Sequence, residues 1–120
     1  IPVYGNTKLA LLLFTRELAE RVKRKGITVN AADPGIVSTN MITMHAWFDP
    51  LTDILFRPFI KTAAQGAATA IHLLLDVEAD SCTGTLQASC HPCTLSNRYT
   101  QHSKTKELWD YTEAIVKKWL

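Results

Sequence analysis

Apolar residues recur at helical spacing in several segments of this sequence. Residues 8–25 predict one helix, because their apolar side chains lie near one helical face and basic residues crowd the last turns. We expect that helix to end at Gly26, since glycine commonly follows a last helical turn. Residues 62–75 predict another helix, with Thr62 as its N-cap. Its expected apolar face comprises Ala63, Ala67, Ala70, Ile71 and Leu74.

Two short apolar segments predict strands. Residues 27–32 lack an in-and-out alternation, which is typical of a strand buried on both faces of a parallel sheet. Residues 83–88 predict a second strand, residues 90–104 a polar loop, and residues 106–120 a terminal amphipathic helix. The expected apolar side of that helix comprises Leu108, Trp109, Ile115, Val116 and Trp119.

This alternation of helices and strands predicts an α/β fold with an incomplete sheet. Two strands alone do not form a stable parallel sheet. We therefore expect residues 1–120 to be a single partial domain, the C-terminal half of a larger α/β domain. Residues 39–61 are irregular and rich in bulky apolar side chains, with one short helix expected between Pro50 and Pro58.

Composition and charge exclude or disfavour several classes of protein. Of the 120 residues, 47% are hydrophobic and 20% charged, which excludes a disordered chain. The net charge of +2 is too balanced for nucleic-acid binding to be favoured. An odd number of cysteines indicates thiols in a reducing compartment, and we expect a cytoplasmic protein. No apolar run is long enough for a transmembrane helix, and no signal peptide is expected.

Tyr4 and Lys8 form the first candidate for chemistry. Residues four apart on a helix share a face, so the phenol and the ammonium group would point the same way. A nearby cation favours a phenolate and lowers the pKa of a tyrosine, which suits proton exchange. The alternative is a packed tyrosine beside a surface lysine, and the spacing alone does not separate the two.

The second candidate follows the strand predicted at residues 27–32. Pro34 and Gly35 interrupt the chain at the carboxyl end of that strand, where parallel α/β sheets bind ligands. Glycine lets the backbone approach a ligand closely, and Thr39 offers a hydroxyl group nearby. The alternative is an ordinary turn.

Taken in order, these segments resemble the short-chain dehydrogenase/reductase family. The resemblance rests on Y-G-N-T-K, a helix, G-I-T-V-N and then P-G-I-V-S-T-N-M. It is strong over residues 1–75 and weaker at residues 83–85 and at Leu108 and Trp109, where retinol-dehydrogenase-like members have comparable endings. The family implies the C-terminal part of a Rossmann-like doubly wound parallel sheet.

The resemblance also implies an oxidoreductase that uses NAD or NADP, with NADP preferred, to interconvert a carbonyl and an alcohol by hydride transfer. Tyr4 matches the catalytic acid/base, and Lys8 the lysine that assists it and hydrogen-bonds the nicotinamide ribose. Pro34, Gly35 and the backbone of Val37 would border the nicotinamide. Thr39 would contact the carboxamide or the nearby phosphate.

Other parts of the family pattern are absent from these residues. The glycine-rich turn that seats a pyrophosphate is not present, and neither are the Asn and Ser that precede the catalytic tyrosine in the family. We therefore expect a fragment of an enzyme that is inactive alone. The resemblance implies a homodimer or tetramer for the full-length protein, commonly paired through the helix that carries Tyr4 and Lys8.

Residues 40–61 lie where family members carry a variable substrate lid. The aromatic residues of this segment suggest a small apolar alcohol, ketone or aldehyde as substrate. Met41, Trp47 and Phe48 are the candidate substrate contacts. The alternative is that such side chains pack under the loop or at a subunit contact.

Two other classes of function compete with the oxidoreductase. Cys82, Cys90, His91 and Cys93 could form a thiol or zinc module, but there is no second C-x-x-C motif, so we interpret them as incidental thiols and predict no metal site. A non-enzymatic binding or scaffolding remnant of the same fold is the other alternative. Intact Tyr4 and Lys8 argue against it.

Overall fold

The computed structural model describes residues 2–38 and 60–119. The first of these segments forms helix α1, a short 3-10 turn η1 and strand β1. The second forms helix α4, the 3-10 turn η3, strands β2 and β3, helices α5 and α6 and a last 3-10 turn η4. Their bounds are α1 Pro2–Val22, η1 Lys23–Lys25, β1 Ala31–Asp33, α4 Ala63–Leu75, η3 Val77–Ser81, β2 Leu86–Ala88, β3 His91–Pro92, α5 Asn97–Thr100, α6 Thr105–Val116 and η4 Lys117–Trp119.

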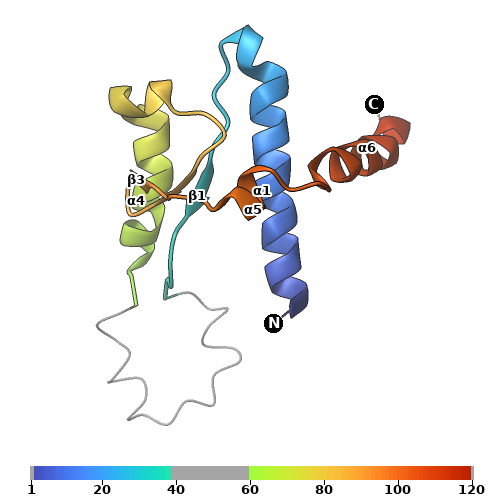
Figure 1. Ribbon diagram of the computed structural model, residues 1–120. Coiled ribbons are helices and arrows are strands. Elements are labelled where there is room, and N and C mark those ends of the chain that lie inside the picture. The colour runs from blue at the N-terminus through green and yellow to red at the C-terminus, as the bar shows by residue number, and fades with distance from the viewer. Residues whose placement is uncertain (1, 39–59, 120) are drawn as a thin grey trace.

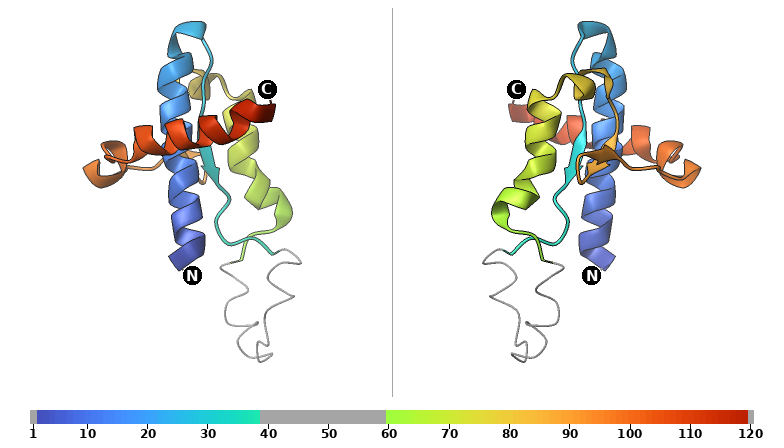
Figure 2. Two further views of the ribbon diagram at one scale, coloured as in Figure 1. Left: turned by 90° about the vertical axis from the view of Figure 1, so that its right-hand side faces the viewer. Right: turned by 90° about the vertical axis from the view of Figure 1, so that its left-hand side faces the viewer.

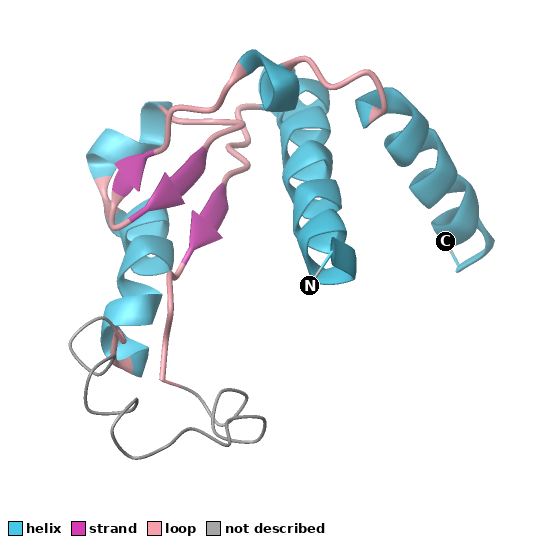
Figure 3. Ribbon diagram, turned by 60° about the horizontal axis from the view of Figure 1, so that its bottom comes forward, coloured by secondary structure: helices cyan, strands magenta, loops and turns pink. Residues whose placement is uncertain are grey.

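The strands form a small mixed sheet between two helices. Strand β1 pairs in parallel with β2, aligning Ala31 with Leu86, and β2 pairs antiparallel with β3, aligning Ala88 with His91. Helix α4 lies on one side of these strands and α1 on the other (Figure 1). Helix α6 contacts α1 and crosses it (Figure 2). A third view shows the sequence of layers from α4 through the strands to α1 and α6 (Figure 3).

Helix α1 confirms the predicted end of the first helix and extends its beginning. Gly26 follows the 3-10 turn in the left-handed conformation, with a φ of 68°. The helix starts at Pro2 rather than at Lys8. A proline fits the first turn, because the N–H group that it lacks has no partner inside the helix. Tyr4 and Lys8 therefore lie on one continuous helix.

Strand β1 is shorter and more exposed than the predicted strand. The ladder covers only Ala31–Asp33, and the expected burial on both faces is wrong for this chain, since Ala32 is exposed. Before the ladder, side-chain hydrogen bonds join the backbone bond that the Gly84 N–H group donates to the Val29 carbonyl. The Asn30 amide donates to the Cys82 carbonyl at 2.8 Å, and its oxygen accepts from both the N–H and the hydroxyl group of Thr85.

Helix α4 confirms the second predicted helix, including its N-cap. The Thr62 hydroxyl accepts from the Gln65 N–H group, and the Gln65 side chain accepts in return from the Thr62 N–H group. The predicted apolar face is wrong, because all five of its residues are exposed. The buried positions are Gly66 and Thr69. Gly66 faces Val37, whose methyl carbon lies only 2.5 Å from the place of an added Cβ.

The segment 90–104 is not only the polar loop that was expected. It contains strand β3 and helix α5, which makes three strands in the described residues rather than two. The turn between β2 and β3 places Ser89 and Cys90 at φ values of 51° and 63°. Such tight hairpin turns favour Asn and Gly, so the sequence S-C carries no turn signal. Pro92 is acceptable because β3 lies at the edge of the sheet.

Trp109 packs helix α6 against α1. The Trp109 ring stacks on Phe14 with 5.3 Å between ring centroids, and the Arg21 guanidinium lies 4.4 Å from the Trp109 ring. The helix ends at Val116, short of the predicted residue 120, and the 3-10 turn follows. The later part of the expected apolar side is exposed, with 79% of Trp119 accessible to solvent.

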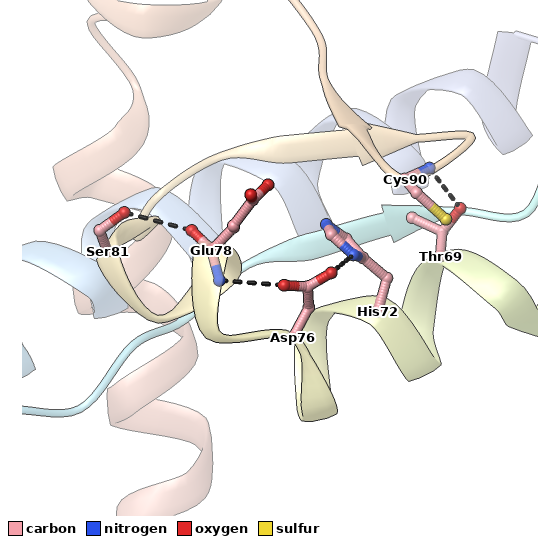
Figure 4. A network of polar contacts seen from close by, with 6 residues as sticks. All are labelled: Thr69, His72, Asp76, Glu78, Ser81 and Cys90. Atoms are coloured by element: carbon pink, nitrogen blue, oxygen red, sulfur yellow. Dashed lines mark hydrogen bonds and ion pairs between the residues drawn. The ribbon is translucent and has the colours of Figure 1, made fainter.

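Polar contacts fix α4 to the hairpin and to the 3-10 turn that follows the helix (Figure 4). The Cys90 N–H group donates to the buried Thr69 hydroxyl at 3.3 Å. His72 Nδ1 lies 2.9 Å from Asp76 Oδ2, and the other Asp76 oxygen accepts from the Glu78 N–H group. The Thr69 contact joins the sheet-facing side of α4 to the hairpin, and the Asp76 contacts fix the C-terminal end of the helix.

The buried core of the described residues is small. Its buried hydrophobic residues are Leu13, Ala19 and Ala79. Among the helices that the structure describes, none is long and apolar enough to cross a membrane. The described residues therefore have an α/β architecture, with helices around a small mixed sheet. Most of their apolar side chains are only partly buried.

Candidate functional site

Helix α1 places Tyr4 and Lys8 on one face near its start. The Lys8 ammonium nitrogen lies 5.2 Å from the centroid of the Tyr4 ring. The Thr7 hydroxyl donates to the Tyr4 carbonyl oxygen at 2.7 Å, inside the same turn. The Tyr4 side chain is 64% exposed, so its phenol group can be reached from solvent. The predicted proximity of the phenol ring and the ammonium group is present.

The turn after β1 is exposed to solvent from Asp33 to Ile36. Asp33 Oδ1 accepts from the Gly35 N–H group at 2.8 Å, which closes a tight turn around Pro34. Gly35 has a φ of 72°, a conformation that other residues adopt only with strain. The Lys61 ammonium lies against this glycine and donates to the Ser89 hydroxyl at 3.2 Å. Asp33 and Lys61 therefore both contact the turn at Gly35.

A pocket of about 480 Å³ lies between α1 and the end of β1. Lys8 lines it from the helix, and Asp33 and Pro34 line it from the strand end. Its apolar part comes from Leu9, Leu12 and Leu86. The two regions singled out from the sequence therefore meet at one pocket, although Tyr4, Gly35 and Val37 do not line it.

Val37 lies beyond the turn in a short parallel bridge to Lys61. The two hydrogen bonds of this bridge come from its neighbours: the Ser38 N–H group donates to the Lys61 carbonyl, and the Lys61 N–H group donates to the Ile36 carbonyl. In a parallel pairing, the N–H and C=O groups of the residue between them point to the opposite side. One donor and one acceptor of Val37 therefore face away from Lys61, in the pattern that a primary amide would match.

Sequence reasoning missed several residues of this region. Tyr99 reaches the pocket from α5, a helix that was not predicted, and Leu86 reaches it from β2. Tyr99 is the only aromatic residue of the segment 90–104, which is the one signal that could have singled it out. Lys61 was expected in a lid and instead braces the turn at Gly35.

Other predicted residues lie outside the described part of the chain. These residues are Thr39 and the candidate substrate contacts Met41, Trp47 and Phe48. Residues 40–59 of the expected lid also lie outside the described part. The cysteines are described and are free thiols. Within residues 2–38 and 60–119, no three His, Cys, Asp or Glu side chains are grouped closely enough to hold a metal ion.

Comparison with known proteins adds an independent observation. Residues 1–46, which include Tyr4, Lys8 and the Pro34–Gly35 turn, match the family described as short chain dehydrogenase. The chain is 36% identical to retinol dehydrogenase 14 of Homo sapiens over 116 residues, which cover 94% of this chain and 34% of that protein. It is 37% identical to retinol dehydrogenase 12 of Mus musculus over 107 residues, which cover 89% of this chain and 34% of that protein.

A relative that is not named as a retinol dehydrogenase has a similar sequence identity to this chain. The chain is 32% identical to a WW domain-containing oxidoreductase of Drosophila melanogaster over 113 residues, covering 94% of this chain and 28% of that protein. No solved structure matches the chain. The chain thus spans about a third of the length of the curated retinol dehydrogenases that it matches.

Proposed function

We propose that this chain, which belongs to the short-chain dehydrogenase/reductase family, supplies the catalytic Tyr–Lys pair and one wall of the nicotinamide site of an NAD(P)-dependent oxidoreductase. Such an enzyme interconverts an alcohol and a carbonyl compound. The observation that carries the proposal is that Lys8, on α1, lines the same pocket as Pro34, at the end of β1. Lys8 therefore lies where it could contact a molecule held beside the Pro34 turn.

The proposed cofactor fits the residues around the turn. Gly35 has no side chain and a φ of 72°, so the backbone of the turn could approach a flat ring closely. The outward N–H and C=O groups of Val37 would pair with the carboxamide of a nicotinamide. Lys8 would donate to the ribose hydroxyl groups from across the pocket. The cofactor, when bound, supplies or accepts the hydride.

The chain's own residues would handle the proton. In the reductive direction, Tyr4 would donate its phenolic proton to the carbonyl oxygen of the substrate. In the oxidative direction, it would accept the proton of the alcohol, and the ammonium group of Lys8 would stabilise the phenolate. The leucines that line the pocket favour an apolar substrate, in keeping with the small apolar alcohol, ketone or aldehyde proposed from the sequence.

The chain is proposed to be one part of this enzyme. The relatives are about three times longer, and the seat for the cofactor pyrophosphate would come from residues outside these 120. We propose that the missing part includes the N-terminal half of a Rossmann-like sheet. The 120-residue chain alone would then have no turnover. For the full-length protein, we propose NADP as the preferred cofactor.

The substitution Tyr4→Phe in the full-length protein tests the proposal. It removes the proton donor and leaves the ring over which Lys8 lies. We expect kcat to fall by about 10²-fold or more, while the Kd for NADPH changes little. Turnover is measured by NADPH absorbance with a panel of apolar ketones and aldehydes, and the Kd by fluorescence titration.

The matched control is Tyr111→Phe. Tyr111 is exposed on α6, outside the pocket lined by Lys8 and Pro34, so its loss should leave kcat unchanged. Equal turnover of the Tyr4→Phe and wild-type proteins would contradict the catalytic role. A full-length protein that binds neither NADPH nor NADH would instead favour the binding or scaffolding alternative.

A further inference from the structure

Lys61 connects two turns at one edge of the sheet. Its backbone bridges to Val37, and its side chain reaches the turn at Gly35 and the hairpin residue Ser89. Strands β1 and β2 are parallel, so the turn after β1 and the hairpin turn after β2 lie at the same edge. The carboxyl edge of a parallel sheet is where α/β proteins bind ligands. Lys61 therefore contacts both of the described turns that border this edge.

The backbone of Lys61 is fixed on both sides. Its N–H group donates to the Ile36 carbonyl at 2.8 Å, and its carbonyl accepts from the Ser38 N–H group at 2.9 Å. The next residue, Thr62, is the N-cap of α4 and exchanges two hydrogen bonds with Gln65. Figure 1 shows the start of α4 beside the chain that leaves β1. The side chain of Lys61 therefore begins at a fixed place beside the turn after β1.

The Lys61 side chain lies over the glycine of that turn. Its Nζ atom is 3.3 Å, and its Cδ atom 3.6 Å, from the place where a Cβ atom would stand on Gly35. The lysine stem therefore fills the space that a side chain at residue 35 would occupy. From there the ammonium group donates to the Ser89 hydroxyl at 3.2 Å. The Gly35 N–H group is bonded separately to Asp33 Oδ1, so two side chains contact this turn by different means.

The glycine makes such a contact useful for binding. Gly35 has a φ of 72° and no side chain, so its backbone has more conformational freedom to lose than that of another residue. If the turn became ordered only when a ligand bound, that loss would reduce the affinity. A turn that is ordered beforehand avoids the cost. The stem of Lys61 supplies this order from outside the turn.

We propose that Lys61 is a positioning residue for the nicotinamide end of the cofactor. The inference rests on the proposed function, in which the outward N–H and C=O groups of Val37 pair with the carboxamide. Lys61 acts through the turn, because its stem packs on Gly35 and its ammonium group is bonded to Ser89. The role is confined to the nicotinamide end, since the glycine-rich turn that would seat the pyrophosphate is not among these residues.

The side chain of Lys61 can be removed without removing the backbone bridge. The hydrogen bonds of the bridge use the N–H and C=O groups of Lys61, which every residue except proline retains. The bond between the ammonium group and the Ser89 hydroxyl is exposed, and the loss of exposed contacts changes the free energy of unfolding little. A substitution at Lys61 should therefore loosen the turn and leave the fold intact.

The binding of two ligands to the full-length protein tests the proposal. One is NADPH, and the other is phospho-ADP-ribose, the same dinucleotide without the nicotinamide ring; NADH and ADP-ribose replace them if the protein binds NADH. For Lys61→Ala, we expect the Kd for NADPH to rise by about five- to tenfold, while the Kd for phospho-ADP-ribose stays unchanged. Lys61→Arg keeps a long stem and a cationic donor, so it should restore most of the affinity. Isothermal titration calorimetry measures each Kd.

The matched control is Lys106→Ala, which removes an exposed lysine of α6 and should change neither Kd. Thermal denaturation shows whether each variant is folded. If the wild-type protein prefers NADPH but Lys61→Ala raises both Kd values equally, or neither, this inference alone is overturned. If the wild-type protein binds the two ligands equally, no nicotinamide is held at the turn, and the proposed function fails together with the inference.

A second measurement needs no cofactor. Hydrogen exchange of the Gly35 N–H group, which is bonded to Asp33, reports the order of the turn in the free protein. We expect Lys61→Ala to speed this exchange by about five- to tenfold. Ser89→Ala should speed it less, because the stem stays over Gly35, and the double variant should match Lys61→Ala alone. Effects that add in the double variant, or unchanged exchange in Lys61→Ala, overturn the proposal.

Discussion

Gly66 is the residue at which one added carbon atom would disturb the site most directly. It lies where α4 crosses the segment after β1, and a Cβ placed there would lie 2.5 Å from the Val37 Cγ2 atom. Val37 is also held by the bridge between its neighbours and Lys61. The Val37 side chain therefore cannot move away from an added Cβ without shifting the backbone that we propose for the nicotinamide site.

The substitution Gly66→Ala should destabilise the protein by about 1–3 kcal/mol, because it overpacks the contact with Val37. The matched control is Gly5→Ala in helix α1, where an added Cβ meets nothing within 4 Å. There the same change should be neutral or stabilise by up to about 1 kcal/mol, since alanine favours helices. Urea denaturation of the two variants measures both effects. Equal free energies of unfolding for the two variants would refute the overpacking argument.

At the scale of elements, local signals predicted the helices better than the strands. Thr62 and Gly26 mark helix ends through their own side chain and backbone, so the sequence located them correctly. Strand β3 depends on Ser89 and Cys90 adopting positive φ values, which neither residue favours. The Cys90 N–H group donates from this turn to Thr69, a contact that no local residue pattern reveals.

The predicted faces of the elements show a second limit of sequence reasoning. A hydrophobic pattern identifies the apolar face of a helix or strand. It does not identify the element that packs against that face. On α4 the side against the sheet is formed by Gly66 and Thr69, which allow close approach, while the larger apolar residues point outward. At the candidate site, Tyr4 and Lys8 could be singled out by their spacing, and Pro34 by its place after a predicted strand. Tyr99 could not, since its position depends on the path of the chain after β3.

Helix α6 gives a prediction at the same scale, because its docking depends on Trp109. The substitution Trp109→Ala removes the stacking on Phe14 and the contact with Arg21, and we expect a loss of about 3 kcal/mol in the free energy of unfolding. It should also make α6 the first site of limited proteolysis. Trp119→Ala is the control: this ring is exposed and contacts only Lys118 among the described aromatic and cationic partners, so its loss should cost less than about 0.5 kcal/mol.

For the whole molecule, the most informative feature is the unpaired side of the sheet. Strand β1 has a partner on one side only in the described residues, and few hydrophobic side chains are fully buried. A parallel strand at the edge of so small a sheet is unusual, because such sheets are normally covered and extended on both sides. The match to relatives three times longer points the same way. A further strand beside β1 is therefore the structural requirement of the proposed enzyme.

Hydrogen exchange of two neighbouring backbone amide groups tests for this further strand. The Ala31 N–H group donates to the Thr85 carbonyl at 2.9 Å, so its hydrogen exchange should be slowed both in the 120-residue chain and in the full-length protein. Bonds alternate in direction along a parallel strand, so the Ala32 N–H group points to the open edge. If a further strand pairs there, Ala32 exchange should slow by about tenfold or more relative to the isolated chain, since each tenfold corresponds to about 1.4 kcal/mol of added protection. Equally fast exchange of Ala32 in both proteins would mean that β1 is a true edge strand, and the larger Rossmann-like sheet would then be excluded.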